Sequence, residues 1–221
     1  GTEQGLCVWS GDSFAPVEEL NALLPEGGRI AAVKARKDAG AGEGVAVAAS
    51  SGLFLREMGS WRRLFPQEGA RSWTAVDVRG IAWDSAGGLW FASPHGVGCL
   101  SREGQWSLYT PENGLPYDDF TGVASAQTGE RSVWFATTKG AIRFDGKSWE
   151  YRQGRRWLPA DHVYGICPDP DGGAWFATHN GVGRIQRKPM TLREKAAFYE
   201  DEIDKYHRRT EYEYVLEAHL K

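Results

Sequence analysis

The sequence lacks any apolar run of the roughly 18 or more residues that a membrane-spanning helix needs. It also lacks the charged start and apolar core of a signal peptide. We therefore expect no membrane contact within these residues. The chain begins at Gly1 and not at an initiating methionine, so we expect a processed or excised segment, and its compartment is left open.

An excess of charge of one sign is absent as well. The 26 basic and 29 acidic residues leave a net charge of −3, which gives no strong field toward nucleic acid or an anionic membrane. Nucleic acid is therefore excluded as an expected partner. With 41% hydrophobic and 25% charged residues, the 221-residue chain is typical of a globular protein that buries a sizeable core.

Cysteine is scarce, and the motifs of several enzyme classes are missing. Cys7, Cys99 and Cys167 show no Cys-x-x-Cys or Cys/His spacing, so we expect no metal site and no cofactor. All three fall in expected strands, which favours buried free thiols. No Gly-rich phosphate loop, serine nucleophile elbow or His-Glu-x-x-His stretch occurs, so the corresponding reaction classes receive no support.

What the sequence does contain is a repeat. The phrases RGIAWDSAGGLWFASPHG, TGVASAQTGERSVWFATTKG and YGICPDPDGGAWFATHNG recur, with a degenerate copy before them. Their closing glycines, Gly52, Gly96, Gly140 and Gly181, are 44, 44 and 41 residues apart, which is the length of one four-stranded propeller blade. The repeat predicts an all-β fold, a β-propeller of about four blades.

Each period contains signals for four short strands. The fourth strand carries an aromatic residue, namely Trp61, Trp106 or Trp149, and Phe14 holds the same place after Gly5. The chain is therefore expected to open on strands three and four of a blade and to end its last repeat after strand three. Two closures stay open: a small ring sealed by strands from both ends, or an arc of a larger ring.

These patterns give a domain prediction. The propeller is expected over residues 1–188, with repeats near 5–52, 53–96, 97–140 and 141–187, and a C-terminal helix and tail over 189–221.

Trp90, Trp134 and Trp175 share one repeat position, where the first copy has Ala46. Since an indole buries a large apolar area, we expect these tryptophans to wedge adjacent blades together and not to serve catalysis. Asp84 and Asp169, each followed by a glycine three residues later, are interpreted as turn formers.

The pattern resembles the two-component regulator propeller repeat, a strand followed by Asp-x-x-Gly, an aliphatic residue, Trp, a short strand, Thr-x-x-Gly and an aliphatic residue. Residues 80–97 and 165–182 fit it well, 122–141 fit in their second half, and 32–53 lack the aspartate and the tryptophan. The resemblance covers roughly residues 1–187. It implies the extracytoplasmic sensing part of a larger protein, attached to further domains, in a periplasmic or extracellular setting, and it supplies no catalytic residues.

A helix is expected to begin after Lys188, because Thr191 and Glu194 have capping-box spacing. It should run over about 191–209, with Leu192, Ala196, Tyr199, Ile203 and Tyr206 forming an apolar stripe. Docking on the propeller, opening a further domain and pairing with a partner helix all remain open. Beyond Thr210 the alternation of Tyr and Leu with Glu favours a strand.

Candidate site residues gather at one end of the expected blades. In a four-stranded antiparallel blade, the turn between strands two and three emerges at the same end as the connection to the next blade. His95 and His179 lie in two such turns, and His162 lies in a connection, so these three are weak candidates for acid–base catalysis. The bland alternative is that they are ordinary histidines of surface loops.

Candidate ligand-binding residues lie at the same end. They are Lys139, Asn180, Tyr117, Asp118, Arg155 and Trp157. Among them, the cations Lys139 and Arg155 could pair with the carboxylate of an acidic sugar or small anion, and the rings of Tyr117 and Trp157 could stack on it. Asp118 and Asp119 are adjacent and should diverge, so a glycosidase-type carboxylate pair is disfavoured.

Two functions are therefore compared. The first is a non-catalytic, sensor-like module that binds a small polar ligand, a glycan or a protein through the face with His95, Lys139 and His179. The alternative is a propeller lyase or hydrolase, or an accessory domain of a larger carbohydrate-active enzyme.

Overall fold

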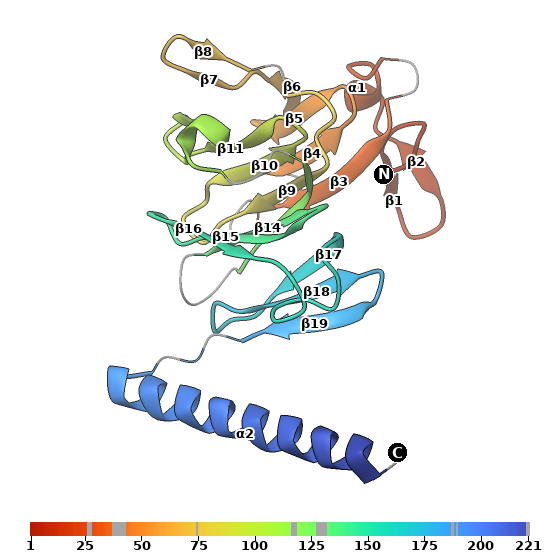
Figure 1. The fold of residues 1–221 in the computed structure, drawn as a ribbon. Coiled ribbons are helices and arrows are strands. Elements are labelled where there is room, and N and C mark those ends of the chain that lie inside the picture. The colour runs from red at the N-terminus through yellow and green to blue at the C-terminus, as the bar shows by residue number, and fades with distance from the viewer. Residues whose placement is uncertain are drawn as a thin grey trace. The chain divides into compact units, whose positions relative to one another are not determined.

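The computed structural model describes residues 1–25, 28–36, 43–73, 75–115, 119–126, 132–186, 188 and 190–219, with side chains in the C-terminal helix up to residue 208. The chain divides into two compact units, Gly1–Gln186 and Arg187–Lys221. The first unit is built from small antiparallel sheets and the second contains one helix (Figure 1).

Within the described residues, three four-stranded sheets and one three-stranded sheet follow one another along the chain, which confirms the predicted blades. Their strands are β3 (Ile30–Ala35), β4 (Val45–Ala49), β5 (Gly52–Glu57) and β6 (Ser60–Leu64); β9 (Gly80–Trp83), β10 (Leu89–Ser93), β11 (Gly96–Leu100) and β12 (Trp106–Tyr109); β13 (Phe120–Ser125), β14 (Val133–Thr137), β15 (Gly140–Phe144) and β16 (Trp149–Arg152); and β17 (Val163–Pro168), β18 (Ala174–Thr178) and β19 (Gly181–Ile185).

Shorter elements connect or precede these blades. They are β1 (Cys7–Trp9) and β2 (Phe14–Pro16), which form a hairpin, the helix α1 (Glu18–Asn21), the hairpin of β7 (Gln67–Glu68) and β8 (Arg71–Ser72), and the 3₁₀ turn Pro111–Asn113. As expected, the chain opens on a two-stranded hairpin that carries Phe14, and the last blade ends after its third strand. The hairpin and the last blade are separate sheets, so they do not pair into one blade.

The innermost strands β3, β9, β13 and β17 lie next to one another in that order, and each pairs with its own sheet on one side only. The hydrophobic core is divided among the spaces between neighbouring blades. One cluster lies between β1–α1 and the first blade, and three more lie between successive blades. Burial between sheets is therefore what joins the repeats.

The repeated tryptophans confirm the wedge prediction at two positions. Trp90 is 4% exposed and meets Phe135 of the next blade at 5.8 Å between ring centroids, and Trp134 is 1% exposed and meets Phe176 at 5.1 Å. Trp175 is 43% exposed, because within the described residues no further blade follows β17–β19.

The interface between the first and second blades is packed by a tryptophan from a different repeat position. Ala46 stands at the tryptophan position and is fully buried. Its cluster contains Trp83 from β9 of the next blade, whose indole N–H donates to the Lys34 carbonyl at 3.2 Å. The neighbouring blade therefore supplies the indole of this interface.

The turn aspartates have different partners. The Asp84 carboxylate accepts hydrogen bonds from the backbone N–H groups of Ala86 and Gly88 and from the Trp90 indole, which confirms it as a turn former. Asp169 holds its turn through its backbone, while its carboxylate pairs with Arg184 at 2.8 Å.

Two sequence-based expectations were wrong. Cys7 and Cys167 are exposed rather than buried, because Cys7 lies in the exposed first hairpin and Cys167 in the last blade, after which no further blade follows among the described residues. The strand expected beyond Thr210 is also absent: α2 runs continuously over Leu192–His219. Once a helix is nucleated, extending it by one residue is inexpensive, and this segment has no sheet partner.

The N-terminus of α2 has the predicted cap. The Thr191 backbone N–H donates to Glu194 Oε2 at 2.8 Å, and the Glu194 N–H donates to Thr191 Oγ1 at 3.3 Å, which is a capping box. Further along, Lys205 pairs with Asp201 and Glu202. Leu192, Tyr199, Ile203 and Tyr206 of the predicted stripe are all exposed. Within the described ranges, no helix combines the length and hydropathy that a membrane crossing requires.

Candidate functional site

The turns between second and third strands lie against the segments that enter the first strands, and we call this end of the propeller the turn end. The Asp77 N–H, just before β9, donates to the Ser50 carbonyl in the β4–β5 turn at 2.8 Å. Thr138, in the β14–β15 turn, donates through its N–H to the Asp119 carbonyl and through Oγ1 to Asp119 Oδ2 at 2.9 Å. The geometry expected from the blade topology is therefore present.

Each of the last three turns is closed by a hydroxyl group. Ser93, Thr137 and Thr178 end the second strands, and each Oγ donates to the carbonyl of the glycine that starts the third strand, at 3.2, 2.9 and 2.8 Å. That glycine has positive φ, for example +133° in Gly140, which disfavours other residues there. The Thr-x-x-Gly motif is thus a turn clamp.

The residues predicted from these turns are displayed to solvent. His95 lies in the β10–β11 turn, Lys139 in the β14–β15 turn, and His179 and Asn180 in the β18–β19 turn, and all four are exposed. In the described part of the chain, no hydrogen bond or ring contact joins His95 to His179. The Lys139 carbonyl accepts a hydrogen bond from the Tyr151 hydroxyl at 2.9 Å.

The predicted residues of the connection before β17 have aromatic and cationic partners. His162 is half-buried and stacks on Tyr164 with 4.4 Å between ring centroids. Trp157, 37% exposed, has the guanidinium carbons of Arg152 and Arg156 at 4.5 and 5.5 Å from its ring. Arg155 is exposed. Tyr117 and Asp118 lie outside the described residues.

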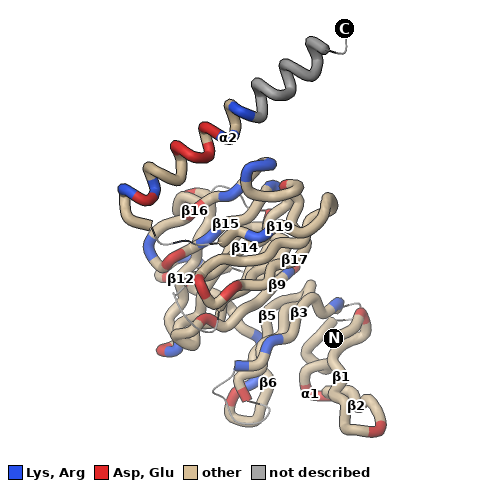
Figure 2. Tube along the Cα trace, turned by 90° about the horizontal axis from the view of Figure 1, so that it is seen from below, with Lys and Arg blue, Asp and Glu red and all other residues tan. Residues whose placement is uncertain are grey.

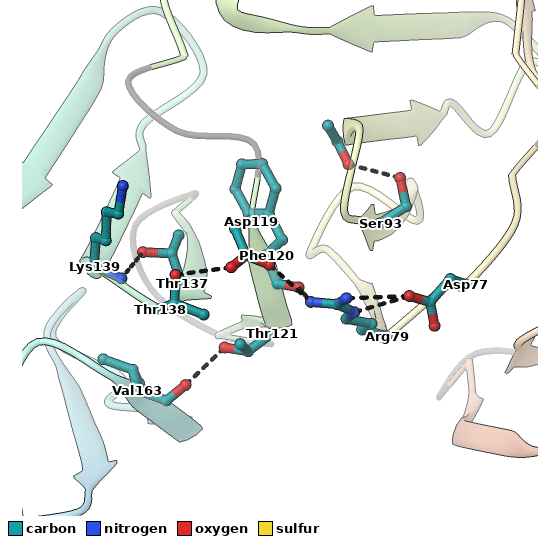
Figure 3. A network of polar contacts seen from close by, with 11 residues as sticks. Asp77, Arg79, Ser93, Asp119, Phe120, Thr121, Thr137, Thr138, Lys139 and Val163 are labelled. Carbon is teal, nitrogen blue, oxygen red and sulfur yellow. Dashed lines mark hydrogen bonds and ion pairs between the residues drawn. The ribbon is translucent and has the colours of Figure 1, made fainter.

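Arg79 organises the centre of the turn end (Figure 3). Its guanidinium pairs with Asp77 at 3.1 Å and with Asp119 at 2.9 Å, and it donates to the Phe120 carbonyl at 3.2 Å. It therefore joins the entries of β9 and β13. One blade further, Thr121 Oγ1 donates to the Val163 carbonyl at 2.6 Å and joins β13 to β17.

Arg79 and Thr121 occupy equivalent positions, because each directly precedes a glycine that pairs with an alanine of the second strand. Gly80 pairs with Ala92 and Gly122 with Ala136. In the same register, Gly165 pairs with Ala177 and Ala32 with Ala48.

A pocket of about 180 Å³ opens where the four innermost strands meet. Its polar and charged lining side chains are Lys34, Arg79, Thr121 and Tyr164, and its apolar walls include Ile81, Val123 and Ile166. Such a mixture of small apolar walls and a few polar groups is typical of small-molecule sites, although this volume is below that of a drug-sized pocket.

Among the described residues, no group of three or more His, Cys, Asp or Glu side chains is placed to hold a metal ion. Charge on the propeller is mixed as well. Figure 2 shows Lys and Arg interspersed with Asp and Glu along the first unit, with no single block of one sign.

The pocket residues Lys34, Arg79, Thr121 and Tyr164 were missed by sequence reasoning. They precede or follow the small residue of the inner strand, so aligning the repeats on Ala32, Gly80, Gly122 and Gly165 would have drawn attention to them. Their side chains differ from one repeat to the next, so the repeat pattern alone did not indicate a site at these positions.

Comparisons with known proteins agree with this architecture. Residues 158–180 match the family model described as Two component regulator propeller. No curated protein matches the chain.

Several solved structures share the fold. The chain is similar to a structure described as the extracellular domain of a hybrid two component system from B. thetaiotaomicron, with a TM-score of 0.62, 17% identity, and coverage of 84% of this chain and 27% of that one. It thus spans about a quarter of that structure's length.

Virginiamycin B lyase from Staphylococcus aureus gives a TM-score of 0.54, with 15% identity and coverage of 74% of this chain and 54% of that one. YCF48 bound to D1 peptide gives a TM-score of 0.51, with 17% identity and coverage of 82% and 56%. At these identities the likeness concerns the fold alone.

Proposed function

Because the chain carries the two component regulator propeller repeat, we propose that it is a sensor-like recognition module that binds a ligand at the turn end without transforming it. The observation that supports this most is the pocket, which residues of all four innermost strands line together. A ligand there would contact all four of these blades, so its binding would change the stability of the whole propeller unit.

The exposed turn residues extend the proposed site beyond the pocket. His95, Lys139, His179 and Asn180 offer donors and acceptors at the same end of the blades. The exposed Arg155 offers a cation, and Trp157, whose ring also has Arg152 and Arg156 close to it, offers an aromatic surface to a glycan or peptide. A small polar ligand, a glycan or a protein segment is the class of partner we propose, and the module would act within a protein that carries further domains.

Binding without turnover is the decisive test. A panel of neutral and acidic oligosaccharides would be titrated into the labelled protein and followed by backbone amide shifts, with product formation assayed in parallel. We expect saturable shifts in the turn end and no product. Single His95→Ala, Lys139→Ala and His179→Ala variants should weaken binding several-fold, while His207→Ala in α2 should leave it unchanged.

A different pattern would reject the proposal. Shifts confined to the opposite end of the blades would place recognition elsewhere. Product formation that disappears in a His95→Ala/His179→Ala double variant would establish the lyase or hydrolase alternative.

A further inference from the structure

Two glycines that line the pocket, Gly122 and Gly165, could carry a side chain without a steric clash, and we call them the floor of the pocket. A Cβ atom on Gly80 would lie 2.8 Å from the Val123 nitrogen, so the close approach of β9 and β13 demands glycine there. A Cβ on Gly122 or Gly165 would meet only the methyl groups of Ala136 at 3.9 Å or Ala177 at 3.7 Å, which is ordinary contact.

Backbone conformation does not explain these two glycines either. Neither Gly122 nor Gly165 is among the residues with positive φ, the region in which glycine is favoured over other residues. Both line the pocket. What their missing side chains leave open is therefore space above the floor and access to the backbone of strands that are unpaired on this side.

The charged side chains that line the pocket favour a negatively charged ligand. Among the described residues that line the pocket, Lys34 and Arg79 are basic and none is acidic. The Arg79 charge is balanced by Asp77 and Asp119. Within the described part of the chain, the exposed Lys34 ammonium makes no ion pair, while its carbonyl is held by the Trp83 indole.

We propose that this pocket binds a small carboxylate, with its charged end at Lys34 and its body over Gly122 and Gly165. The inference deepens the proposed function and rests on it, since it names the ligand chemistry of the same site. A pocket of about 180 Å³ is smaller than the sites that take drug-sized ligands, which favours a small carboxylate. The Tyr164 hydroxyl, which also lines the pocket, can donate a further hydrogen bond to the carboxylate.

The test uses butyrate and its uncharged analogue butyramide, titrated into the full chain and followed by backbone amide shifts. We expect butyrate to give saturable shifts at Gly122 and Gly165 and butyramide to bind at least about tenfold more weakly, because only the acid meets the Lys34 charge. Lys34→Gln should weaken butyrate binding about tenfold. Lys147→Gln, at an exposed lysine in the β15–β16 turn, is the matched control and should bind as the unmodified protein does.

The glycine floor is tested separately. Gly122→Ala and Gly165→Ala should keep the thermal stability of the unmodified protein, since a methyl group fits both sites, yet lose butyrate binding because it fills the floor. Gly80→Ala should lower stability. If either floor variant unfolds, Lys34→Gln still decides the question, because that side chain is exposed.

Equal binding of butyrate and butyramide, or butyrate binding that Lys34→Gln leaves unchanged, would overturn the carboxylate assignment. So would the absence of shifts at Gly122 and Gly165. If these results occur while an oligosaccharide still shifts the turn end, only this inference fails. If neither butyrate nor any oligosaccharide binds, the proposed function fails with it.

Discussion

At the scale of single residues, Trp134 and Trp175 allow the same side chain to be compared in two environments. Trp134 is 1% exposed between two blades, and Trp175 is 43% exposed on the last one. Trp134→Ala should therefore lower the free energy of unfolding by about 3–5 kcal/mol. Trp175→Ala should lower it by less than about half as much, because much less apolar area is lost. Urea denaturation of both variants measures this, and equal losses would show that Trp175 is covered in solution.

Thr137 is a second residue whose role can be isolated. It is fully buried, its hydroxyl donates to the Gly140 carbonyl, and the same oxygen accepts from the Lys139 N–H at 3.1 Å. Thr137→Val keeps the shape and removes both bonds, so it should cost about 1–3 kcal/mol in a denaturant titration. Thr178→Val, at a less buried copy of the clamp, should cost less. An unchanged free energy of unfolding in Thr137→Val would contradict a stabilising role for these two hydrogen bonds.

At the scale of elements, the N-terminus of α2 depends on its capping box. Thr191→Ala removes the side-chain bond to the Glu194 N–H and should speed hydrogen exchange of the first-turn amides roughly fivefold. Exchange in the β-sheets, measured in the same sample, serves as the control. Unchanged exchange in the first turn would mean that the cap contributes nothing.

The same cap has a pH dependence. Hydrogen bonds from the Thr191 N–H and hydroxyl lower the pKa of Glu194. Since the folded pKa is lowered, the cap's contribution is complete above the ordinary glutamate pKa of about 4.3 and is lost as pH falls through the lowered value. First-turn exchange protection, corrected for the intrinsic pH dependence, should therefore decline in that acidic range and stay level above it.

Elements also show how far the sequence could be read. The glycine spacing and the fourth-strand aromatics predicted the blades, because each copy must bury the same face. The alternation of Tyr212, Tyr214 and Leu216 with glutamates suggested a strand and was misleading, since alternation identifies a strand only where one face has a sheet or core to meet.

The site could be predicted less well than the fold. The turn end followed from blade topology, but Lys34, Arg79 and Tyr164 did not, because their convergence depends on how closely four inner strands approach one another. Ala31, Arg79, Thr121 and Tyr164 share one register position and have nothing chemical in common, so no motif marks them.

At the scale of the whole molecule, the blades are coupled through their inner strands. Arg79 bridges Asp77 and Asp119, and its removal would leave two facing carboxylates without their cation. Arg79→Met should lower the free energy of unfolding by about 1.5–3 kcal/mol. The deficit should shrink in high salt, which screens both the lost attraction and the carboxylate repulsion.

Denaturant titrations at low and high NaCl would measure this coupling. Thr121→Val, which removes one uncharged bond between β13 and β17, is the comparison and should show little salt dependence. A salt-independent loss in Arg79→Met would mean that Arg79 acts through packing alone.

Two of the bonds between neighbouring inner strands are received by the main chain: Thr121 donates to the Val163 carbonyl and Arg79 to the Phe120 carbonyl. Every residue type carries that carbonyl, so these two bonds place no demand on the side chain of the residue that accepts them. Copies would then be free to diverge at their inward positions, so inner strands of near-identical origin can form a lining to which each blade contributes a different chemical group.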